Sequence, residues 1–453
     1  MVAHTPNRQR LLAFLILGLC YFPEVTVAET LEARGDLQWR RGNMHTHSHW
    51  SDGDDYLEMI GLWYRERGYD FLVFSDHNVL ANRERWIDVE KSKGGMVAFE
   101  KLKARFPEQT KTRRIANETR AEEQTGESEK PPERLQVRLS TFADVSKRLN
   151  QPGEYLLIQG EEISDHFEKL PIHMNVSNVA ELIEPAGGRS VLEAMQANVR
   201  AAYEQRRATG QPMIIHLNHP NYGYAVTAED LARVVGEQFF EVYNGHPGVN
   251  NSGDKQHANV ERLWDIVLTL RLDQLKLPLM YGLATDDGHE YHHVPSRRSE
   301  PGRGWVMVLS EELTAETLIE SLEAGRFYAS SGVTLQRVET TEKTFAVEVD
   351  AVEGENYTID FIGTRMGYDA ASKPVVDAEG KEIHATHKYS DEVGETLASI
   401  EGTSAEYEFH GDEIYVRARV TSSKLHSNPS EIGDFEQAWC QPVIGPAAAK
   451  VDE

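Results

Sequence analysis

The chain has 453 residues, of which 40% are hydrophobic, 9% aromatic and 26% charged, and its formal net charge is -26. This composition is that of a folded globular protein rather than a disordered chain, and the length favours two domains over a single core. The negative charge argues against non-specific binding of nucleic acid, which needs Lys and Arg to displace phosphate counterions, although it leaves room for a local basic pocket.

A signal peptide is predicted over residues 1–28. A short basic region precedes the apolar stretch Leu11–Phe22, which is too short to span a bilayer, and Thr26–Ala28 fits a small-residue cleavage site. An uncleaved anchor or a buried helix is the alternative. Lipid attachment at Cys20 is disfavoured, because Leu19 is bulkier than the residue that usually precedes a lipidated cysteine. We expect export to a periplasm or beyond, and no membrane span in the mature chain.

Between about residues 41 and 331, short apolar runs alternate with longer amphipathic segments, a pattern typical of a parallel sheet with crossover helices. The expected strands are Phe71–Phe74, Tyr155–Ile158, Met213–Ile215, Phe239–Val242 and Leu279–Tyr281. The expected helices are Tyr56–Arg67, Ser190–Arg207, Ala228–Val235 and Gln256–Ile266. Because the carboxyl ends of parallel strands meet on one face, polar residues that follow the strands should collect there.

Two regions depart from this alternation. Residues 84–150 are rich in Lys, Arg and Glu, which predicts a mostly helical or partly disordered insertion. It is either a lid over the site or a solvated surface addition, and long charged loops are more often the latter. Residues 332–442 alternate polar and apolar positions, as in Thr344–Val349, Tyr357–Ile362 and Ile414–Val420, which predicts a small antiparallel β-sandwich. Residues 443–453 form an expected tail.

Clusters of His, Asp and Glu follow or close the apolar runs. In the first, His45-Thr-His47, both imidazoles project to the same face of a strand and can bind one ion together. The others are Asp52-Gly53, Asp76-His77, Glu161-Glu162, Pro-Ile-His173, His216-Leu-Asn-His219 and Asp286-Asp287-Gly-His289. Imidazole with carboxylate suits zinc, manganese or iron, and no cysteine lies near the clusters to make a thiolate site. The sequence therefore predicts a polynuclear metallohydrolase.

The order of these clusters over Arg41–Ser331 resembles the polymerase and histidinol phosphatase (PHP) family. The segment Gly325–Gly332 and the β-rich part after it further resemble the carbaryl hydrolase branch, the CehA/McbA group. The resemblance implies an α/β fold, a distorted seven-stranded (β/α)7 barrel with two or three divalent ions at its C-terminal mouth. The β-sandwich follows the barrel.

The resemblance also implies a ligand set. His45, His47, Glu162 and Asp287 would hold a first ion, and Glu162, His173 and His219 a second, with Glu162 bridging the two. Asp52, His77 and His289 would hold a third. Glu161 competes with Glu162, and Asp286 with Asp287; the Gly-x-Glu and Asp-x-His spacings favour the second member of each pair. The remaining member would orient a ligand or face solvent.

Ions that share a water can drive hydrolysis without a protein nucleophile. No Gly-x-Ser-x-Gly elbow, Walker loop or Rossmann glycine pattern occurs in the sequence. His246 is a candidate proton donor to the leaving group, ahead of His49, His292 and His293. Arg297 and Arg298 either clamp a substrate phosphate or face solvent.

The expected substrate is a small-molecule ester, and the first hypothesis is a phosphoesterase acting on a phosphomonoester or a nucleotide, including 5'-to-3' exonuclease action. A carbamate or carboxylic ester hydrolase is the second, because the same activated water can attack carbon. A non-catalytic exported protein that keeps the metals for structure is the third.

Overall fold

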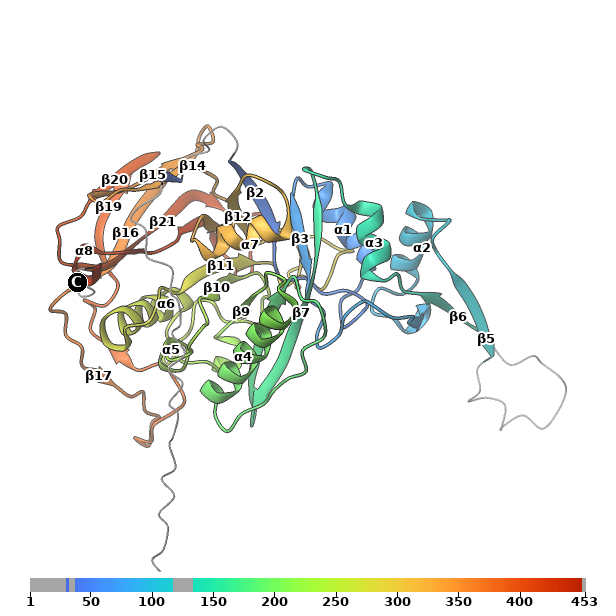
Figure 1. Cartoon of the computed structure of the whole chain (residues 1–453), viewed down its shortest axis with the longest axis horizontal. Coiled ribbons are helices and arrows are strands. Elements are labelled where there is room, and N and C mark those ends of the chain that lie inside the picture. The colour runs from blue at the N-terminus through green and yellow to red at the C-terminus, as the bar shows by residue number, and fades with distance from the viewer. Residues whose placement is uncertain (1–29, 32–36, 117–132, 450–453) are drawn as a thin grey trace, which may run out of the picture.

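The computed structural model of the protein describes residues 30–31, 37–116 and 133–449 (Figure 1). The predicted signal peptide, with Cys20, lies outside these described residues. Among the helices within those ranges, none combines the length and the apolar character that crossing a bilayer requires.

A sheet of 14 strands runs through the molecule and makes the fold a mixed α/β one. The strands in its first half along the chain are β2 (Gln38–Asn43), β3 (Phe71–Phe74), β7 (Leu156–Phe167), β8 (Leu170–Ser177), β9 (Ile214–Leu217), β10 (Phe239–Asn244) and β11 (Tyr281–Thr285). The later ones are β12 (Trp305–Ser310), β13 (Phe327–Ser330), β16 (Tyr357–Arg365), β19 (Glu395–Glu401), β21 (Glu413–Leu425), β22 (Phe435–Cys440) and β23 (Val443–Ile444). Their order is β11-β10-β9-β8-β7-β3-β2-β12-β13-β22-β21-β16-β19, and β23 pairs with β21.

The pairing directions differ from the all-parallel pattern that the sequence predicts. The pairs β2–β3, β3–β7, β9–β10 and β10–β11 are parallel, as expected. The pairs β7–β8 and β8–β9 are antiparallel. The cause is a tight turn at Glu168, whose φ is 54°, which sends β8 back along β7 without a crossover helix. Beyond the ends of β2 and β11, Thr46 and Gly288 form one parallel bridge.

Helices cover both faces of the first half of the sheet (Figure 1). They are α1 (Leu57–Arg65), α3 (Phe142–Leu149), α4 (Val191–Thr209), α5 (Ala228–Ala232), α6 (Val260–Thr269), with a π-helical continuation over Leu270–Leu275, and α7 (Ala315–Glu323). The predicted helices all exist, but α6 begins four residues later than expected, because the Asn259 side chain accepts the N–H of Arg262 and caps it there. The side chains of α4, α5 and α6 share a core with β8, β9 and β10.

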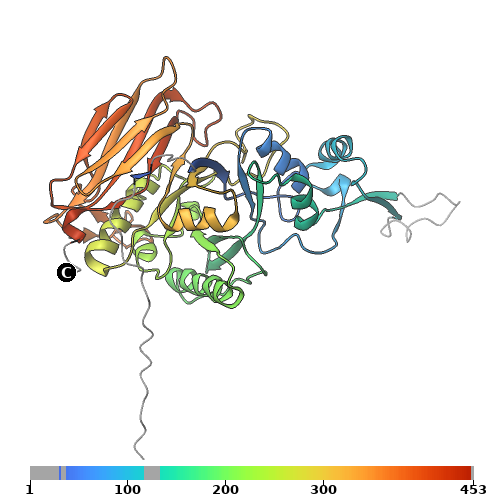
Figure 2. The ribbon, with the colours of Figure 1, turned by 45° about the horizontal axis from the view of Figure 1, so that its top comes forward.

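The charged insertion is not mainly helical in its described part. It contains β4 (Trp86–Asp88), the 3-10 turn η1 (Val89–Lys91), α2 (Gly95–Arg105), β5 (Thr112–Ala116) and β6 (Glu133–Arg138), before α3. The strands form a separate antiparallel sheet in the order β4-β6-β5. Figure 2 shows this region (cyan) at one end of the molecule and the β-rich C-terminal part (orange to red) at the other.

The C-terminal part adds a second antiparallel sheet, ordered β1-β14-β15-β20. Its strands are β1 (Thr30–Leu31), β14 (Leu335–Thr340), β15 (Thr344–Val349) and β20 (Ser404–Glu408). Buried residues of β14 and β15 pack against those of β16 and β21, so the two sheets enclose one core. The predicted strand Thr344–Val349 is confirmed to the residue, and β16 and β21 extend the other two. Two short strands, β17 (Ser372–Lys373) and β18 (Lys388–Tyr389), pair separately.

The end of the chain is tied back to the first half of the sheet. Trp439 in β22 stacks on Tyr243 of β10 with ring centroids 5.6 Å apart. The Gln441 side-chain amide makes two hydrogen bonds of 2.9 Å to the backbone of Gly282 in β11. Residues 443–449, expected as a tail, instead provide β23 and the short helix α8 (Pro446–Ala449).

Candidate metal centre

Two histidines just beyond the end of β2 begin a buried cluster of potential ligands. His45 and His47 are fully buried, and the N–H of His47 donates to the Gly288 carbonyl at 3.0 Å. The bridge between Thr46 and Gly288 keeps this segment extended, so both imidazoles face the same side. Their Nε2 atoms lie 3.0 Å apart, a distance at which at most one of the two can carry a proton.

The β7–β8 hairpin contributes Glu162 and His173. In its register Glu162 lies opposite Asn175 and His173 opposite Ser164, so the side chains of Glu162 and His173 point to the same face. Glu162 Oε1 is 2.9 Å from His173 Nδ1. Both residues therefore lie within strands, rather than in the loops after strands that the sequence suggests.

Glu162 and Asp287 are the carboxylates at the centre of the cluster. Glu162 Oε2 is 3.2 Å from His47 Nε2 and 2.7 Å from His77 Nδ1. Asp287 Oδ1 is 3.3 Å from His45 Nε2 and 3.2 Å from His47 Nε2. His219 is at the edge of this group, with its Nε2 3.6 Å from Glu162 Oε1.

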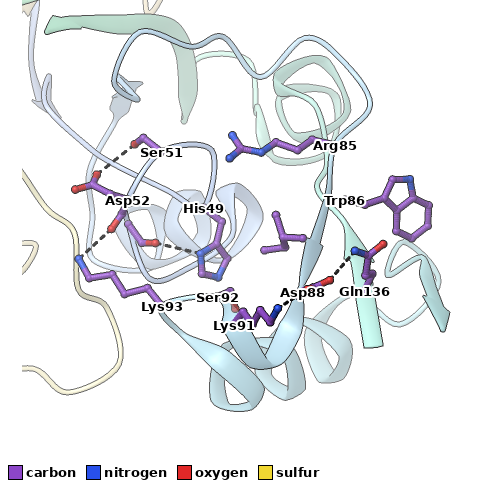
Figure 3. Close-up of a pocket in the computed structure, with 12 residues that line it drawn as sticks. His49, Ser51, Asp52, Arg85, Trp86, Asp88, Lys91, Ser92, Lys93 and Gln136 are labelled. Carbon is purple, nitrogen blue, oxygen red and sulfur yellow. Dashed lines mark hydrogen bonds and ion pairs between the residues drawn. The ribbon is translucent and has the colours of Figure 1, made fainter. Parts of the chain in front are cut away.

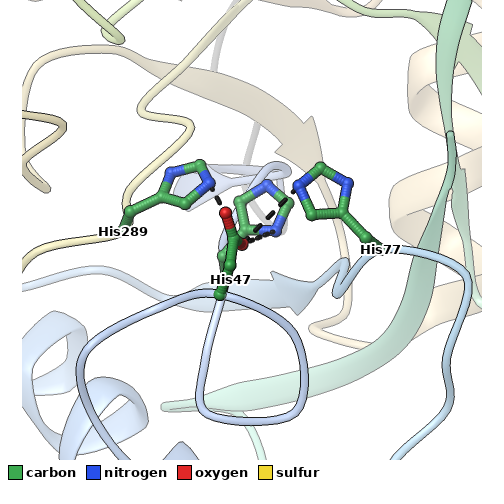
Figure 4. A group of neighbouring side chains, drawn as sticks. His47, His77 and His289 are labelled. Carbon is green, nitrogen blue, oxygen red and sulfur yellow. Dashed lines mark ion pairs between the residues drawn. The ribbon is translucent and has the colours of Figure 1, made fainter. Parts of the chain in front are cut away.

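A second set of side chains lies at the mouth of the cluster. Asp52 Oδ1 is 3.3 Å from His289 Nε2, 3.6 Å from His77 Nε2 and 3.8 Å from His47 Nδ1. Figure 4 shows the rings of His47, His77 and His289 around this point. The Asp52 side chain is 55% exposed, whereas Glu162 is fully buried, so solvent reaches the cluster from the Asp52 side.

The nine residues predicted from the sequence as ligands thus lie close together, but the structure divides them differently from the three predicted sets. Groups whose ligand atoms lie within 4.8 Å of one another are His45-His47-Glu162, His77-Glu162-His173 and His47-Asp52-His77-His289. His47 and His77 each belong to two of these groups. Glu162 also belongs to two, which fits a bridging carboxylate.

The hydrogen bonding inside the cluster fits a cation better than it fits protons. Glu162 Oε2, Asp287 Oδ1 and His173 Nδ1 are buried and have no hydrogen-bond partner of acceptable geometry, although imidazole nitrogens surround both carboxylates. Buried polar atoms are almost always paired, because an unpaired one costs about 1–3 kcal/mol. Converging carboxylate oxygens and imidazole nitrogens of this kind are the donor set of zinc, manganese or iron.

The pKa values of the side chains in the cluster also favour a bound cation. Burial favours a protonated Glu162, but the imidazoles around it, first among them His77 and His173, hold its pKa well below the usual value. Burial lowers the pKa of His47 to about 3, with neighbouring imidazoles adding to the effect. Burial also opposes charge on His77, but Glu162 and Asp52 outweigh it and raise its pKa to about 9. The carboxylates around His45 and His289 likewise outweigh burial and raise the pKa of each ring. Ionised carboxylates and neutral imidazoles are what a metal needs, so binding would displace the protons held by His45, His77 and His289.

Glu241 is a buried carboxylate behind the cluster that the sequence reasoning missed. Its Oε1 lies 2.7 Å from His45 Nδ1, and its Oε2 accepts the backbone N–H of His219 at 2.7 Å. The Thr285 hydroxyl and the Asn244 amide donate to it at 2.7 and 2.8 Å. Burial opposes its ionisation, but His45 and its other donors hold its pKa below the usual value. Glu241 therefore fixes the orientation of His45 and turns its Nε2 toward the cluster.

The substitution Glu241→Gln should weaken metal binding about 10- to 100-fold, the usual effect of losing such an outer partner of a metal ligand. The new amide would remove the negative charge. Its NH2 group would also face a side chain or backbone group that now donates a hydrogen bond to Glu241. Competition with a chromophoric chelator measures the affinity. Glu237→Gln is the matched control, because Glu237 is equally buried but, among the described residues, its side chain accepts only the N–H groups of Gln238 and Phe239. Equal affinities in the two variants would contradict the role of Glu241.

Three further polar residues hold ligands in place. The Asn218 amide donates to Glu162 Oε1 at 2.9 Å. Ser164 Oγ lies 2.6 Å from His77 Nδ1, and Ser299 Oγ lies 3.1 Å from His289 Nδ1. A Ser or Asn carries no sequence signal of such a role, because both are common in turns and on surfaces.

Glu161 and Asp286, the competing members of the two acidic pairs, point away from the cluster. Glu161 follows the alternation of β7 to the opposite face, where its Oε1 accepts the N–H of Ile183 at 2.8 Å. Asp286 Oδ1 accepts the backbone N–H groups of Arg303 and Gly304 at 2.6 and 2.8 Å. It anchors the loop before β12.

The predicted proton donor lies beside the cluster, and the predicted arginines lie further out. His246 is half-buried, with its ring centroid 5.6 Å from that of His289. Arg297 and Arg298 are exposed, and the Arg298 guanidinium lies 3.4 Å from Glu290. Of the weaker candidates, His293 is exposed and His292 is held by Asp54 and Lys101, whereas His49 lines a neighbouring pocket.

No protein-family model matches the chain, and no curated protein matches it. Two solved structures are similar to it. One is a two-domain protein containing a predicted PHP-like metal-dependent phosphoesterase from Bacteroides vulgatus ATCC 8482, at 13% identity and a TM-score of 0.37 over 90% of this chain and 96% of that one. The other is a proposed metal-dependent phosphoesterase from Bifidobacterium adolescentis ATCC 15703, at 14% identity and a TM-score of 0.29 over 62% of this chain and 96% of that one.

Proposed function

We propose that the chain is a metal-dependent phosphoesterase that hydrolyses a small phosphorylated ester with two or three divalent ions of zinc, manganese or iron. The observation that carries this proposal is that Glu162 Oε2 and Asp287 Oδ1 are buried without hydrogen-bond partners among converging imidazoles. Bound together, such ions supply an activated water and stabilise the attacking and leaving oxygens of a displacement at phosphorus.

The chain's own residues would bind and orient these ions and the substrate. Glu162 is the bridging ligand in this proposal, because His77 and His173 approach its two different oxygens at 2.7 and 2.9 Å. Asp52 marks the side from which the substrate arrives in this proposal, since it is the most exposed of the ligands at 55%, ahead of His77 at 29%. The full proposed set is His45, His47, Asp52, His77, Glu162, His173, His219, Asp287 and His289.

His246 is assigned to the leaving group. Its Nδ1 accepts the N–H of Gly248 at 3.0 Å, so in the neutral ring the proton is on Nε2. A proton at that atom can be donated to a developing alkoxide. Arg297 and Arg298 are assigned to the substrate, because a flexible exposed arginine can fold onto a phosphate.

We further propose that the fold is a distorted (β/α)7 barrel followed by a β-sandwich. The bridge between Thr46 and Gly288 supports a distorted (β/α)7 barrel, because it joins the extensions of the first and last of seven strands. The core between the two C-terminal sheets supports a β-sandwich. We also propose that the chain is related to the carbaryl hydrolase branch. We propose further that it is exported to a periplasm or beyond.

The proposed reaction is tested by measuring the release of p-nitrophenol from p-nitrophenyl phosphate, p-nitrophenyl acetate and a p-nitrophenyl carbamate. The metal-loaded protein should hydrolyse p-nitrophenyl phosphate, a chelator should abolish the activity, and zinc, manganese or iron should restore it. Elemental analysis of the same sample should find two or three ions per chain.

The other hypotheses predict different results. Turnover of p-nitrophenyl acetate or of a p-nitrophenyl carbamate, but not of the phosphate, would replace the phosphoesterase with a carboxylic ester or carbamate hydrolase. No turnover of any of the three by metal-loaded protein would favour a non-catalytic binding protein.

A further inference from the structure

The charged insertion lines a pocket that opens beside the metal centre (Figure 3). Its volume is about 540 Å³, within the range of small-molecule sites. Asp52 belongs both to this pocket and to the mouth of the cluster, and the Lys93 ammonium donates to the Asp52 backbone carbonyl at 2.9 Å. The pocket and the metal centre are therefore adjacent and share Asp52 in their walls.

The wall of this pocket has three cationic and two carboxylate side chains, although the whole chain carries a net charge of -26. Arg85, Lys91 and Lys93 line it, and Figure 3 shows them around the imidazole of His49. The Lys91 side chain is 72% exposed, and its nearest carboxylate oxygen, on Asp88, lies 3.8 Å away. The Arg85 guanidinium donates to the Trp50 carbonyl, a neutral partner.

The carboxylates in the wall are already engaged. Asp88 is 3.0 Å from the Arg134 guanidinium and accepts the Gln136 amide at 2.6 Å. Asp52 faces the histidines of the cluster. Asp88 thus shares its charge among Lys91, Arg134 and Gln136, and Lys93 lies 3.9 Å from Glu290. Arg85 has no ion-pair partner within the described part of the chain, and cations that are incompletely balanced attract an anionic ligand.

His49 adds an independent sign of a ligand. It is 6% exposed, and its Nδ1 lies 3.1 Å from the Gly53 carbonyl, so Nδ1 carries the proton and Nε2 presents a lone pair. Nε2 is buried and has no hydrogen-bond partner among the described residues. The His49 residue lines the pocket, so a movement of its ring that exposes Nε2 would offer this acceptor to a hydroxyl or N–H group of a bound molecule.

We propose that this pocket binds the alcohol part of the substrate and selects phosphomonoesters that carry a hydroxyl and a second anionic group, a carboxylate or another phosphate. The inference rests on the proposed phosphoesterase function. The phosphoryl group would lie at the metal centre, and the remainder of the molecule would pass Asp52, with its second anion between Lys91, Lys93 and Arg85. The insertion is then a specificity element rather than a solvated addition.

Two phosphomonoesters with the same carbon skeleton test the selection. 3-Phosphoglycerate ends in a carboxylate where glycerol 3-phosphate ends in a neutral hydroxymethyl group. The metal-loaded protein should turn over 3-phosphoglycerate with a higher kcat/KM at low ionic strength. The substitution Lys91→Glu should lower the ratio of the two kcat/KM values about tenfold, since it replaces a partly exposed attraction by a repulsion. Lys103→Glu is the matched control, because Lys103 is an exposed lysine of the same insertion that does not line the pocket; its ratio should equal that of the wild type.

Binding of two phosphonates separates this inference from the proposed function, because a C–P bond is not hydrolysed. Calorimetry should find that 2-carboxyethylphosphonate binds more tightly than propylphosphonate and that Lys91→Glu removes the preference. That result without any turnover of phosphate esters would uphold the pocket and reject the phosphoesterase. Turnover of both glycerol derivatives, with equal binding of the two phosphonates and a ratio unchanged by Lys91→Glu, would overturn the pocket and leave the phosphoesterase standing.

Discussion

The substitution Glu162→Ala should abolish stoichiometric metal binding and reduce kcat/KM on p-nitrophenyl phosphate roughly a thousandfold or more, because metal assistance contributes several kcal/mol to such a reaction. The reason is geometric. Glu162 is fully buried and belongs to two of the candidate ligand groups, with His47, His77 and His173 each within 3.2 Å of one of its oxygens. No other carboxylate in the described part of the chain belongs to two of these candidate groups.

Glu161→Ala provides the control for this experiment. Glu161 is as buried as Glu162 and lies one residue earlier in the same strand, but it bonds to Ile183 on the opposite face. Its loss should leave the metal content unchanged and most of the activity intact. Metal analysis of both proteins, alongside their activity, checks the assignment, and equal losses in the two variants would refute it.

The largest expected effect on stability comes from Arg417→Met. Arg417 in β21 is buried and makes two hydrogen bonds of 2.7 and 2.8 Å to Asp265 of α6, with Glu261 at 3.2 Å. These neighbours raise its pKa, although burial opposes the charge. Removing one partner of a buried ion pair leaves the other charge without compensation, which typically costs about 3–5 kcal/mol. We expect a reduction of that size in the free energy of unfolding, measured in urea with the metal content held constant.

An exposed pair serves as the comparison. Arg189 and Glu193 lie four residues apart around the start of α4, with an N–O distance of 2.9 Å and an Arg189 side chain that is 90% exposed. Solvent screens such a pair, so Arg189→Met should not shift the urea midpoint measurably. If both substitutions shifted the midpoint by the same small amount, the link between α6 and β21 would not have the proposed importance.

Much of the site could be predicted because its ligands come in short local patterns. The spacing of His45 and His47 places both rings on one side of an extended segment, wherever that segment lies in the fold. Phe71–Phe74 is correct to the residue, since all four side chains are buried and polar residues flank them. The position of Glu162 within the pair Glu161-Glu162 also agrees with the spacing argument.

Other features depend on contacts that no local pattern encodes. The turn between β7 and β8 has Glu168 in the left-handed region, without the Gly or Asn that marks most hairpins, so an antiparallel pair could not be distinguished from a parallel one. β5 is exposed along most of its length and therefore lacks the alternation of a half-buried strand. Glu241 lies inside an apolar run, and it reaches His45 only because β10 folds behind the cluster.

The attachment of the chain's end to β10 and β11 has a consequence for biosynthesis. Trp439 and Gln441 contact strands that carry or support Glu241, and Gln441 is synthesised 159 residues after Gly282. Until they arrive, the open edge of β13 lacks its partner strand and the back of β10 is uncovered, a state prone to mispairing. We therefore expect the proposed metal centre to reach its final arrangement only after β22 has been synthesised.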